Sequence, residues 1–255
     1  MHKDHRDFLK DSVRKRTDFS QTAQSRGIAQ PPWQKPLPPG AGKIALAKPG
    51  SWQAIPELSL EDAIARRKSR RNYTAQGLRL EELAFLLWAT QGLRAAGAAR
   101  HNFRTVPSAG CRHAIETYIA VMRVEALEKA LYRYLPLDHA LVEVVRYPDL
   151  EEQLIRATFG QVFCGTAAAT FVWTAIPERM EWRYGQASYK VIALDAGHIC
   201  QNLYLACENI GAGTCAVAAY DQEEMDKFLG VDGRDEFVIY AAPVGKVPQE
   251  EKCWC

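Results

Sequence analysis

The chain of 255 residues lacks a strong excess of either charge, because its formal net charge is +2 and its pI is near 8.1. Attraction to nucleic acid or to anionic lipid would therefore need a local patch. Residues 1–30 are charged and contain no long apolar run, so we expect neither a signal peptide nor a membrane anchor. The seven cysteines lack the paired spacing of a secreted disulfide framework. These absences predict a cytoplasmic protein with reduced thiols and with no nucleic-acid or membrane partner.

The composition is that of an ordinary globular protein, with 47% hydrophobic and 24% charged residues. Prolines crowd residues 30–40 and disfavour helices and sheet ladders there. We therefore predict an extended, polar and Pro-rich N-terminal arm over residues 1–50, one globular domain over residues 51–247 and a C-terminal tail over residues 248–255.

Hydrophobic periodicity and the residues that begin or end helices predict the main secondary-structure elements of that domain. Helices are expected where apolar residues recur at helical spacing, namely at 58–67, 80–91, 190–210 and 221–229. Ser59 is the expected cap of the first of these helices, and Gly92 is the expected end of the second. The residue pattern at 190–210 is apolar on nearly every side, which predicts a buried central helix. Runs rich in β-branched and aromatic residues predict strands at 115–122, 168–175 and 237–244. Helices and strands do not alternate regularly, so we predict an α+β fold with a mainly antiparallel sheet.

The run Arg66-Arg67-Lys68-Ser69-Arg70-Arg71 is the first candidate binding feature. Guanidinium groups and a hydroxyl would together match the oxygens of a phosphate dianion. The same run could instead be a nucleic-acid patch, a localisation signal or cations that offset a helix dipole on a solvated face.

Three further features are weak when each is taken alone. The small residues of Val106-Pro107-Ser108-Ala109-Gly110 would let backbone amides approach a ligand, although such turns are common in loops. The glycines of Gly211-Ala212-Gly213-Thr214-Cys215 could contact a ligand or only cap the preceding helix. The lysine of Gly245-Lys246 could add a cation to a phosphate site or be an ordinary surface lysine.

Together and in this order, these features resemble the nitroreductase family of flavoenzymes, and within it the SagB-type dehydrogenase branch. The likeness runs from about residue 58 to residue 246. Its most specific stretches are Pro107-Ser108-Ala109-Gly110, Trp182-Arg183-Tyr184-Gly185, and Asp195-Ala196-Gly197-His198 leading through Gln201-Asn202-Leu203-Tyr204 to Gly211-Ala212-Gly213-Thr214-Cys215. The resemblance implies a central, mainly antiparallel sheet flanked by helices, an intertwined homodimer, and one FMN in each of two clefts between the subunits.

The resemblance also implies which residues contact FMN. The phosphate, the ribityl chain and the pyrimidine edge would be contacted by Arg67, Lys68, Ser69 and Arg71, with Lys246 closing on the phosphate. The ring would lie along residues of the other subunit, Pro107, Ser108 and Ala109. Its dimethylbenzene side or N5 edge would meet Gly213 and Thr214.

The implied activity is two-electron hydride transfer from NADH or NADPH to a small-molecule acceptor such as a quinone or a nitroaromatic compound. Azoline-oxidising members of the SagB branch have a Lys-Tyr pair where this chain has Arg183-Tyr184. Because arginine is not deprotonated in proteins, Arg183 can hold charge but cannot act as a general base. Tyr184 can be an acid or a packing residue. An azoline dehydrogenase, or a flavin-binding accessory subunit of a peptide-modifying complex, remains the alternative.

Two smaller features complete the sequence-based expectations. Asp195, His198 and Asn202 share one stripe of the long helix, which predicts a polar seam in the subunit interface and no metal site. Cys253 and Cys255 lie at the end of the chain and receive no assignment.

Overall fold

A seven-stranded sheet forms the centre of the computed structural model, which describes residues 6–94 and 102–248. The strand order is β1-β4-β3-β2-β5-β7-β6, and all neighbouring strands are antiparallel. The strands are β1 (Lys43–Ala45), β2 (Ile115–Val121), β3 (Ala130–Leu135), β4 (Ala140–Val145), β5 (Ala169–Ala175), β6 (Ala212–Thr214) and β7 (Phe237–Lys246). The expected strands β2, β5 and β7 therefore adjoin one another in the middle of the sheet, and the expected α+β fold class is confirmed.

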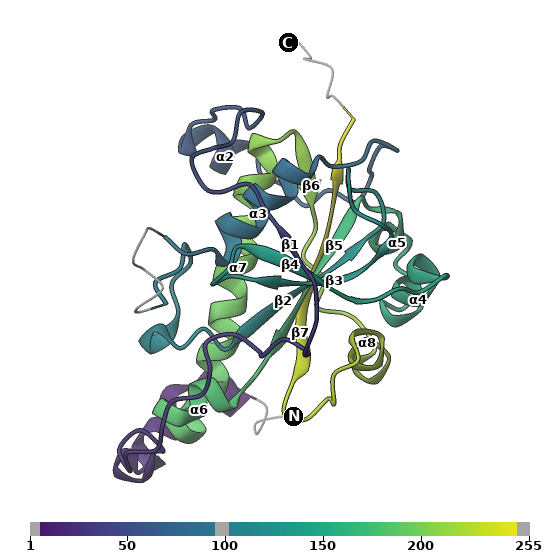
Figure 1. The fold of residues 1–255 in the computed structure, drawn as a ribbon. Coiled ribbons are helices and arrows are strands. Elements are labelled where there is room, and N and C mark those ends of the chain that lie inside the picture. The colour runs from purple at the N-terminus through teal and green to yellow at the C-terminus, as the bar shows by residue number, and fades with distance from the viewer. Residues whose placement is uncertain (1–5, 95–101, 249–255) are drawn as a thin grey trace.

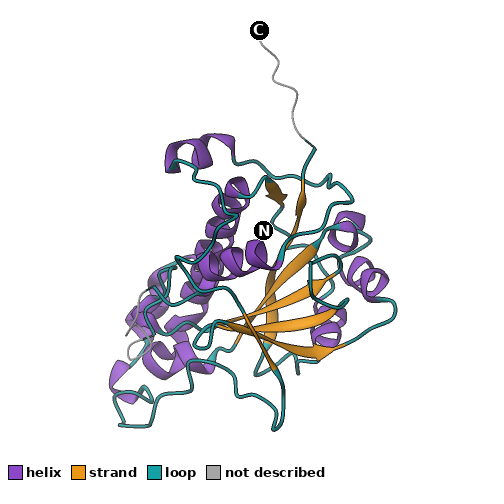
Figure 2. Cartoon of the chain, turned by 45° about the horizontal axis from the view of Figure 1, so that its top comes forward, coloured by secondary structure: helices purple, strands orange, loops and turns teal. Residues whose placement is uncertain are grey.

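Helices cover both faces of this sheet (Figures 1 and 2). The helices are α2 (Leu60–Arg66), α3 (Leu80–Gln91), α4 (Leu150–Ala157), α5 (Val162–Thr166), α6 (Glu178–Tyr184), α7 (Ser188–Asn209) and α8 (Gln222–Leu229). Side chains of β5 alternate between the two faces of the sheet and pack in the hydrophobic core on each face. Phe171 and Trp173 pack in the core with α3 and α7, whereas Val172 packs in the core with α4, α5 and α8.

Local signals set the ends of several helices. The Ser59 hydroxyl accepts a hydrogen bond from the Asp62 amide at 3.0 Å and begins α2, and Asp221 accepts one from the Glu224 amide at 3.1 Å and begins α8. Gly92 ends α3 as predicted, and a Cβ atom there would lie 2.5 Å from the Trp88 ring. That close approach explains why a glycine stands at this position.

Helix α7 is the long helix predicted from the sequence, but it is buried on one side only. Ile192, Ile199 and Leu203 pack in the core, whereas Tyr189 is 48% and Leu194 is 51% exposed. Within a single chain, the helix predicted to be buried is therefore covered on one side. The outer face of α7 presents apolar side chains to solvent.

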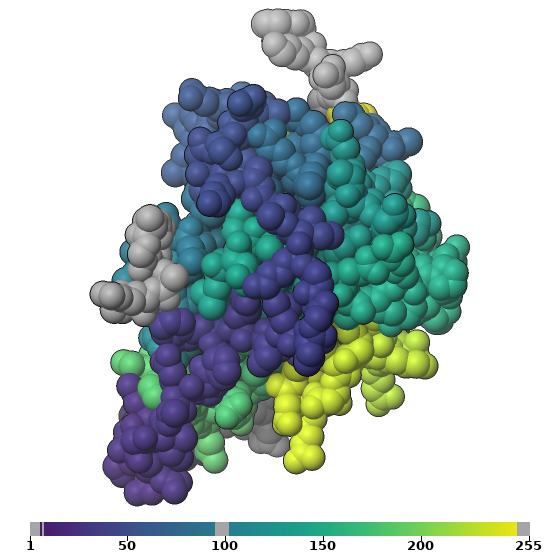
Figure 3. Space-filling model, viewed as in Figure 1, coloured from purple at the N-terminus to yellow at the C-terminus, as the bar shows by residue number. Residues whose placement is uncertain are grey.

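The N-terminal segment lies along the body of the molecule (Figure 3). It begins with short 3-10 helices, Asp7–Leu9, Asp11–Arg16 and Phe19–Gln21, and its Pro-rich part is extended as expected. Arg133 of β3 donates hydrogen bonds to the carbonyl oxygens of Lys35 and Pro36 at 2.8 and 2.9 Å. Strand β1 within this segment pairs with β4. The segment is thus bound to the sheet, while the division at residue 50 stays a prediction.

Two other observations bear on the sequence-based expectations. No helix in residues 6–94 and 102–248 is long and apolar enough to span a membrane. Cys253 and Cys255, with most of the predicted C-terminal tail, lie outside the described residues.

Candidate active site

A cationic segment follows α2 directly and is held by α7. The Arg67 guanidinium lies 5.3 Å from the centre of the Tyr204 ring, and the Ser69 hydroxyl is hydrogen-bonded to the Tyr204 hydroxyl at 2.9 Å. The Arg70 amide donates to the Thr214 carbonyl oxygen at 2.9 Å. The structure therefore brings the sequence-predicted residues Ser69 and Thr214 together, although they are far apart in the sequence.

The exposed side chains of this segment border a cavity of about 250 Å³. We call this cavity and its basic lining the cationic cradle, formed by Lys68, Ser69, Arg70, Arg71, Asn72, Val247 and Pro248. The Arg71 guanidinium lies 5.8 Å from the Phe163 ring centre. Arg70 forms an ion pair with Glu208 at 3.4 Å.

Gly213 and Thr214 of β6 lie against the basic segment beside the cradle. A Cβ atom at Gly213 would lie 2.6 Å from Arg70 Cδ, so a larger residue would push the basic segment outward. Thr214 is 1% exposed, and its Oγ1 atom has no hydrogen-bond partner in the described part of the chain. An orphaned hydroxyl next to several cations fits an oxygen-rich anionic ligand.

Lys246, the last residue of β7, faces inward next to the cradle but does not line it. Its amino group donates to Glu82 Oε1 at 2.7 Å and to the Ile210 carbonyl oxygen, and its side chain is 11% exposed. Burial acts to raise the pKa of Glu82, but hydrogen bonds from Lys246 and Arg79 hold that pKa below its ordinary value. Two of the three ammonium protons of Lys246 are thus engaged within the chain.

The second group of predicted residues surrounds a tight turn. The Ala109 amide donates to Asp195 Oδ1 at 3.3 Å, and the Ser108 hydroxyl accepts from the His113 amide at 2.9 Å. Burial raises the pKa of Asp195, against the effect of its hydrogen bonds from Ser108 and Ala109. Asp195 therefore fixes the turn from α7.

Gly110 lets the end of α6 pack closely on this turn. Its φ is +57°, and a Cβ atom there would lie 2.6 Å from the Tyr184 hydroxyl and 2.7 Å from Arg183 Cδ. Arg183 is exposed and Tyr184 half-buried, with the guanidinium 5.7 Å from the Tyr184 ring centre. The residues predicted to be catalytic thus adjoin the turn predicted to lie along the flavin ring.

The two groups lie toward opposite ends of α7, as the positions of α2 and α6 in Figure 1 show. Asp195 holds the turn and Tyr204 holds the cradle, and their separation of nine positions along α7 corresponds to roughly 14 Å of helix. The three residues of the predicted polar seam, Asp195, His198 and Asn202, have different surroundings in the single chain. Asn202 donates to the Ala89 carbonyl oxygen at 2.8 Å and His198 is exposed in the single chain, and the seam between subunits stays a prediction.

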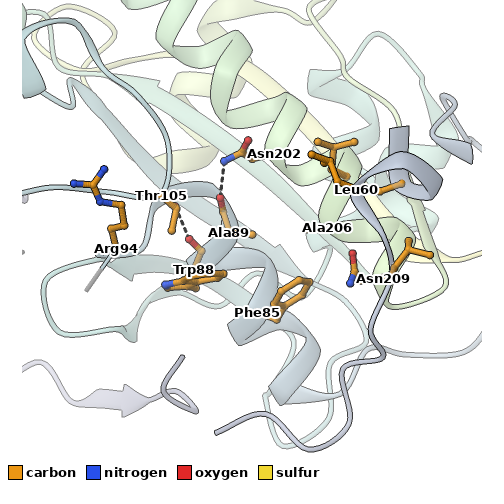
Figure 4. Close-up of a pocket in the computed structure, with 12 residues that line it drawn as sticks. Leu60, Phe85, Trp88, Ala89, Arg94, Thr105, Asn202, Ala206 and Asn209 are labelled. Carbon is orange, nitrogen blue, oxygen red and sulfur yellow. Dashed lines mark hydrogen bonds between the residues drawn. The ribbon is translucent and has the colours of Figure 1, made fainter. Parts of the chain in front are cut away.

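An apolar groove, which no sequence motif predicted, lies between α2, α3 and α7 (Figure 4). Its volume is about 470 Å³, and it is lined by Leu58, Leu60, Ala63, Phe85, Trp88, Ala89, Arg94, Thr105, Asn202, Leu205, Ala206 and Asn209. On α2, Leu60 is 66% and Ile64 57% exposed. Leu60 and Ile64, an apolar pair at i, i+4 on the outer side of the capped helix α2, were the feature of the sequence that could have indicated an apolar surface here.

Comparisons with known proteins agree with this architecture. A sequence model described as "Nitroreductase family" matches residues 64–246. The protein MJ1384 of Methanocaldococcus jannaschii, which bears a nitroreductase name, is 31% identical over 75% of this chain and 93% of its own length. A solved structure from Anabaena variabilis, also named as a nitroreductase, has a TM-score of 0.67 at 27% identity, with 82% of this chain covered. This chain spans only 42% of that protein.

A fourth comparison concerns the fold alone. A chain in the E. coli microcin synthetase McbBCD complex, solved with truncated pro-MccB17 bound, has a TM-score of 0.61 at 20% identity. The match covers 93% of this chain and 91% of that one.

Proposed function

The chain belongs to the nitroreductase family of oxidoreductases, as its motifs predicted, and from this premise we propose that it binds FMN and carries hydride from NADH or NADPH to quinone or nitroaromatic acceptors. The observation that supports FMN most directly is the cationic cradle beside the orphaned Thr214 hydroxyl. When bound, FMN supplies the two-electron chemistry, and the chain supplies binding, orientation and charge.

The cradle residues suit the FMN phosphate, which carries close to two negative charges near neutral pH. In the proposal Lys68 and Arg71 of the cradle donate charge-assisted hydrogen bonds, and Ser69 adds a hydroxyl. Arg67, which precedes the cradle residues in the sequence and lies over the Tyr204 ring, donates as well. Each such bond contributes roughly 1.5 to 3 kcal/mol. Lys246 retains a third ammonium proton beyond its bonds to Glu82 and Ile210, which it can offer to a phosphate oxygen.

The remaining assigned residues would bind the ring, and this requires a homodimer in the proposal. Gly213 and Thr214 stand beside the cradle, but Pro107, Ser108 and Ala109 lie toward the far end of α7. A twofold-related copy can place its own turn opposite the cradle of the first chain. The exposed Leu60, Ile64 and Leu194 are the kind of surface that such a copy would cover.

At the turn, Arg183 and Tyr184 would act on the reactant. Arg183 holds a fixed positive charge and can orient an electron-rich group, but it cannot remove a proton. Tyr184 can donate a proton from a position against Gly110. These properties favour acceptors that take hydride directly over substrates that must first lose a proton.

The alternative is an azoline dehydrogenase or an accessory subunit of a peptide-modifying complex. It is favoured by the fold likeness to the McbBCD chain and by the Trp182-Arg183-Tyr184-Gly185 stretch. Arg183 in place of lysine counts against a proton-abstracting role. Turnover of a reduced nicotinamide by the isolated protein would separate the enzyme from the accessory subunit.

The absorbance spectrum and the size of the purified protein test the proposal. We expect a yellow homodimer whose flavin absorbance is bleached anaerobically by NADH or NADPH and restored by a quinone or a nitroaromatic compound. A colourless monomer that does not bind added FMN would overturn the proposal. Bound flavin that resists both nicotinamides would favour the alternative.

A further inference from the structure

Two guanidinium groups flank the turn on the side of Tyr184. Arg112 Nε donates to the Gly110 carbonyl oxygen at 3.0 Å. Arg183 Cδ passes so close to Gly110 that a Cβ atom there would lie 2.7 Å from it. Both arginines therefore meet at the same short segment, against which the Tyr184 hydroxyl also packs.

Neither guanidinium is balanced by a carboxylate in the part of the chain that the structure describes. Arg112 donates to the neutral Gln30 side chain at 3.1 Å and lies 4.9 Å from the Trp182 ring centre. Burial lowers the pKa of Arg112, and the positive charge of Arg183 lowers it further. By contrast, Arg146 on the surface is paired with Glu143 at 2.7 Å. Two like charges held together without an acid favour the binding of an anion.

The scaffold holds Arg112 in a fixed position. Trp182 Nε1 donates to the Ile28 carbonyl oxygen at 2.8 Å, and the Gln24 amide donates to the Trp182 carbonyl oxygen at 2.8 Å. The N-terminal segment thus fixes the ring on which Arg112 lies and also supplies Gln30. Preorganised donors lose less entropy when they bind a ligand.

We propose that Arg112 and Arg183 bind a carboxylate group of the acceptor and thereby make the enzyme selective for acidic acceptors. This inference rests on the proposed function, because it takes the turn and Tyr184 as the place where the acceptor lies. It concerns the substrate class and is independent of how the FMN phosphate is bound.

The test compares 4-nitrobenzoate with its neutral isostere 4-nitrobenzamide on the protein as purified. We expect the KM of nitrobenzoate to be about tenfold below that of nitrobenzamide, as for one net charge-assisted contact. Arg112→Gln and Arg183→Gln should each reduce this KM ratio severalfold, Arg112→Lys should keep part of it, and the control Arg146→Gln should leave it unchanged. High salt should also reduce the ratio.

Isothermal titration of both compounds, without nicotinamide, gives a readout that needs no turnover. Tighter binding of nitrobenzoate that is lost in both glutamine variants supports binding of a carboxylate by the two arginines even if the protein does not turn over either compound. Equal binding of the two compounds, or a preference that survives both substitutions, overturns it. A loss confined to the KM of NADH or NADPH assigns the arginines to the dinucleotide phosphates and also overturns it.

Discussion

The chain has one cluster of arginines buried beneath its N-terminal segment and another exposed after α2, and the two are balanced differently. In the buried cluster, Glu116 is 3% exposed and accepts from Arg179 at 2.6 Å and from the Lys35 amide at 2.9 Å, with Arg133 at 3.5 Å. Burial acts to raise the pKa of Glu116, but the two guanidiniums hold that pKa below its ordinary value. The buried cations thus have an acid of the chain as their partner.

In the exposed cluster, Arg67 and Arg71 lie over the rings of Tyr204 and Phe163. No carboxylate lies within ion-pair distance of either guanidinium among residues 6–94 and 102–248. A ring face weakly stabilises a cation and leaves its N–H donors accessible. The buried arginines therefore stabilise the fold through an ion pair with Glu116. Arg67 and Arg71 have no such carboxylate partner among the described residues, which is the arrangement expected where cations bind an anionic ligand.

Breaking the buried pair should give the largest effect. Arg179→Met leaves Glu116 as a buried charge with weaker compensation, and we expect the free energy of unfolding to fall by about 3 to 5 kcal/mol. Arg67→Met should change it by less than about 1 kcal/mol, because Arg67 is only partly buried and leaves behind no ion-pair partner among the described residues. Urea unfolding followed by circular dichroism measures both. Equal losses would erase the distinction between the two clusters.

Removing the exposed cations should instead weaken the binding of FMN. We expect Arg67→Ala and Arg71→Ala each to raise the Kd for FMN by roughly 10- to 100-fold. The matched control is Arg66→Ala, because Arg66 is exposed and paired with Asp62 at 2.8 Å. Quenching of flavin fluorescence on binding gives the three Kd values. Equal losses at all three positions would indicate a diffuse basic patch.

His113 is buried next to Arg179 of the buried cluster, and its protonation would add a further positive charge there. Burial lowers the pKa of His113 to about 2, with further lowering by Arg104 and Arg112. In the unfolded chain, the imidazole of His113 binds a proton with a pKa near 6.5, whereas in the folded chain it stays neutral at that pH. The contribution of neutral His113 to the free energy of unfolding is therefore complete above pH 6.5 and declines as the pH falls below it. Between pH 8 and about pH 5.5, His113 should account for a loss of about 1.4 kcal/mol.

The variant His113→Gln isolates that contribution. Its free energy of unfolding should fall less between the same two pH values, by about the amount assigned to His113, and urea titrations at both values measure the difference. The same pH dependence in both proteins would show that His113 takes up its proton while folded.

How far the sequence predicts this molecule depends on whether the signal is local. The caps at Ser59 and Asp221 and the runs of β-branched and aromatic residues in β2 and β5 lie within single elements, and they predicted those elements correctly. Strands β3 and β4 were not identified. Strand β3 carries the charged residue Arg133, whose partners Glu116 and the distant N-terminal segment adjoin it only in the folded chain.

The candidate site follows the same rule. The basic run and the turn are short motifs and were found from the sequence. The engagement of Lys246 by Glu82 and Ile210 joins three distant parts of the chain, and so does the position of Arg112 between Trp182 and Gln30. No spacing within the sequence encodes these contacts, since they exist only once the sheet and α7 have brought the segments together.

The smallest effect is expected at Tyr184, which has no part in the charge balance of either cluster. Tyr184→Phe removes a hydroxyl that packs against Gly110 and should lower kcat/KM for a quinone by less than about threefold, because water can supply protons to an open site. Stopped-flow reoxidation with a neutral quinone measures this, with Arg146→Gln as the control. A contrary result would be specific: NADH and NADPH fail to bleach the flavin, while an azoline peptide is aromatised at a rate that collapses in Tyr184→Phe. Tyr184 would then carry the proton transfer of an azoline dehydrogenase, and Arg183 would have replaced lysine without loss of that activity.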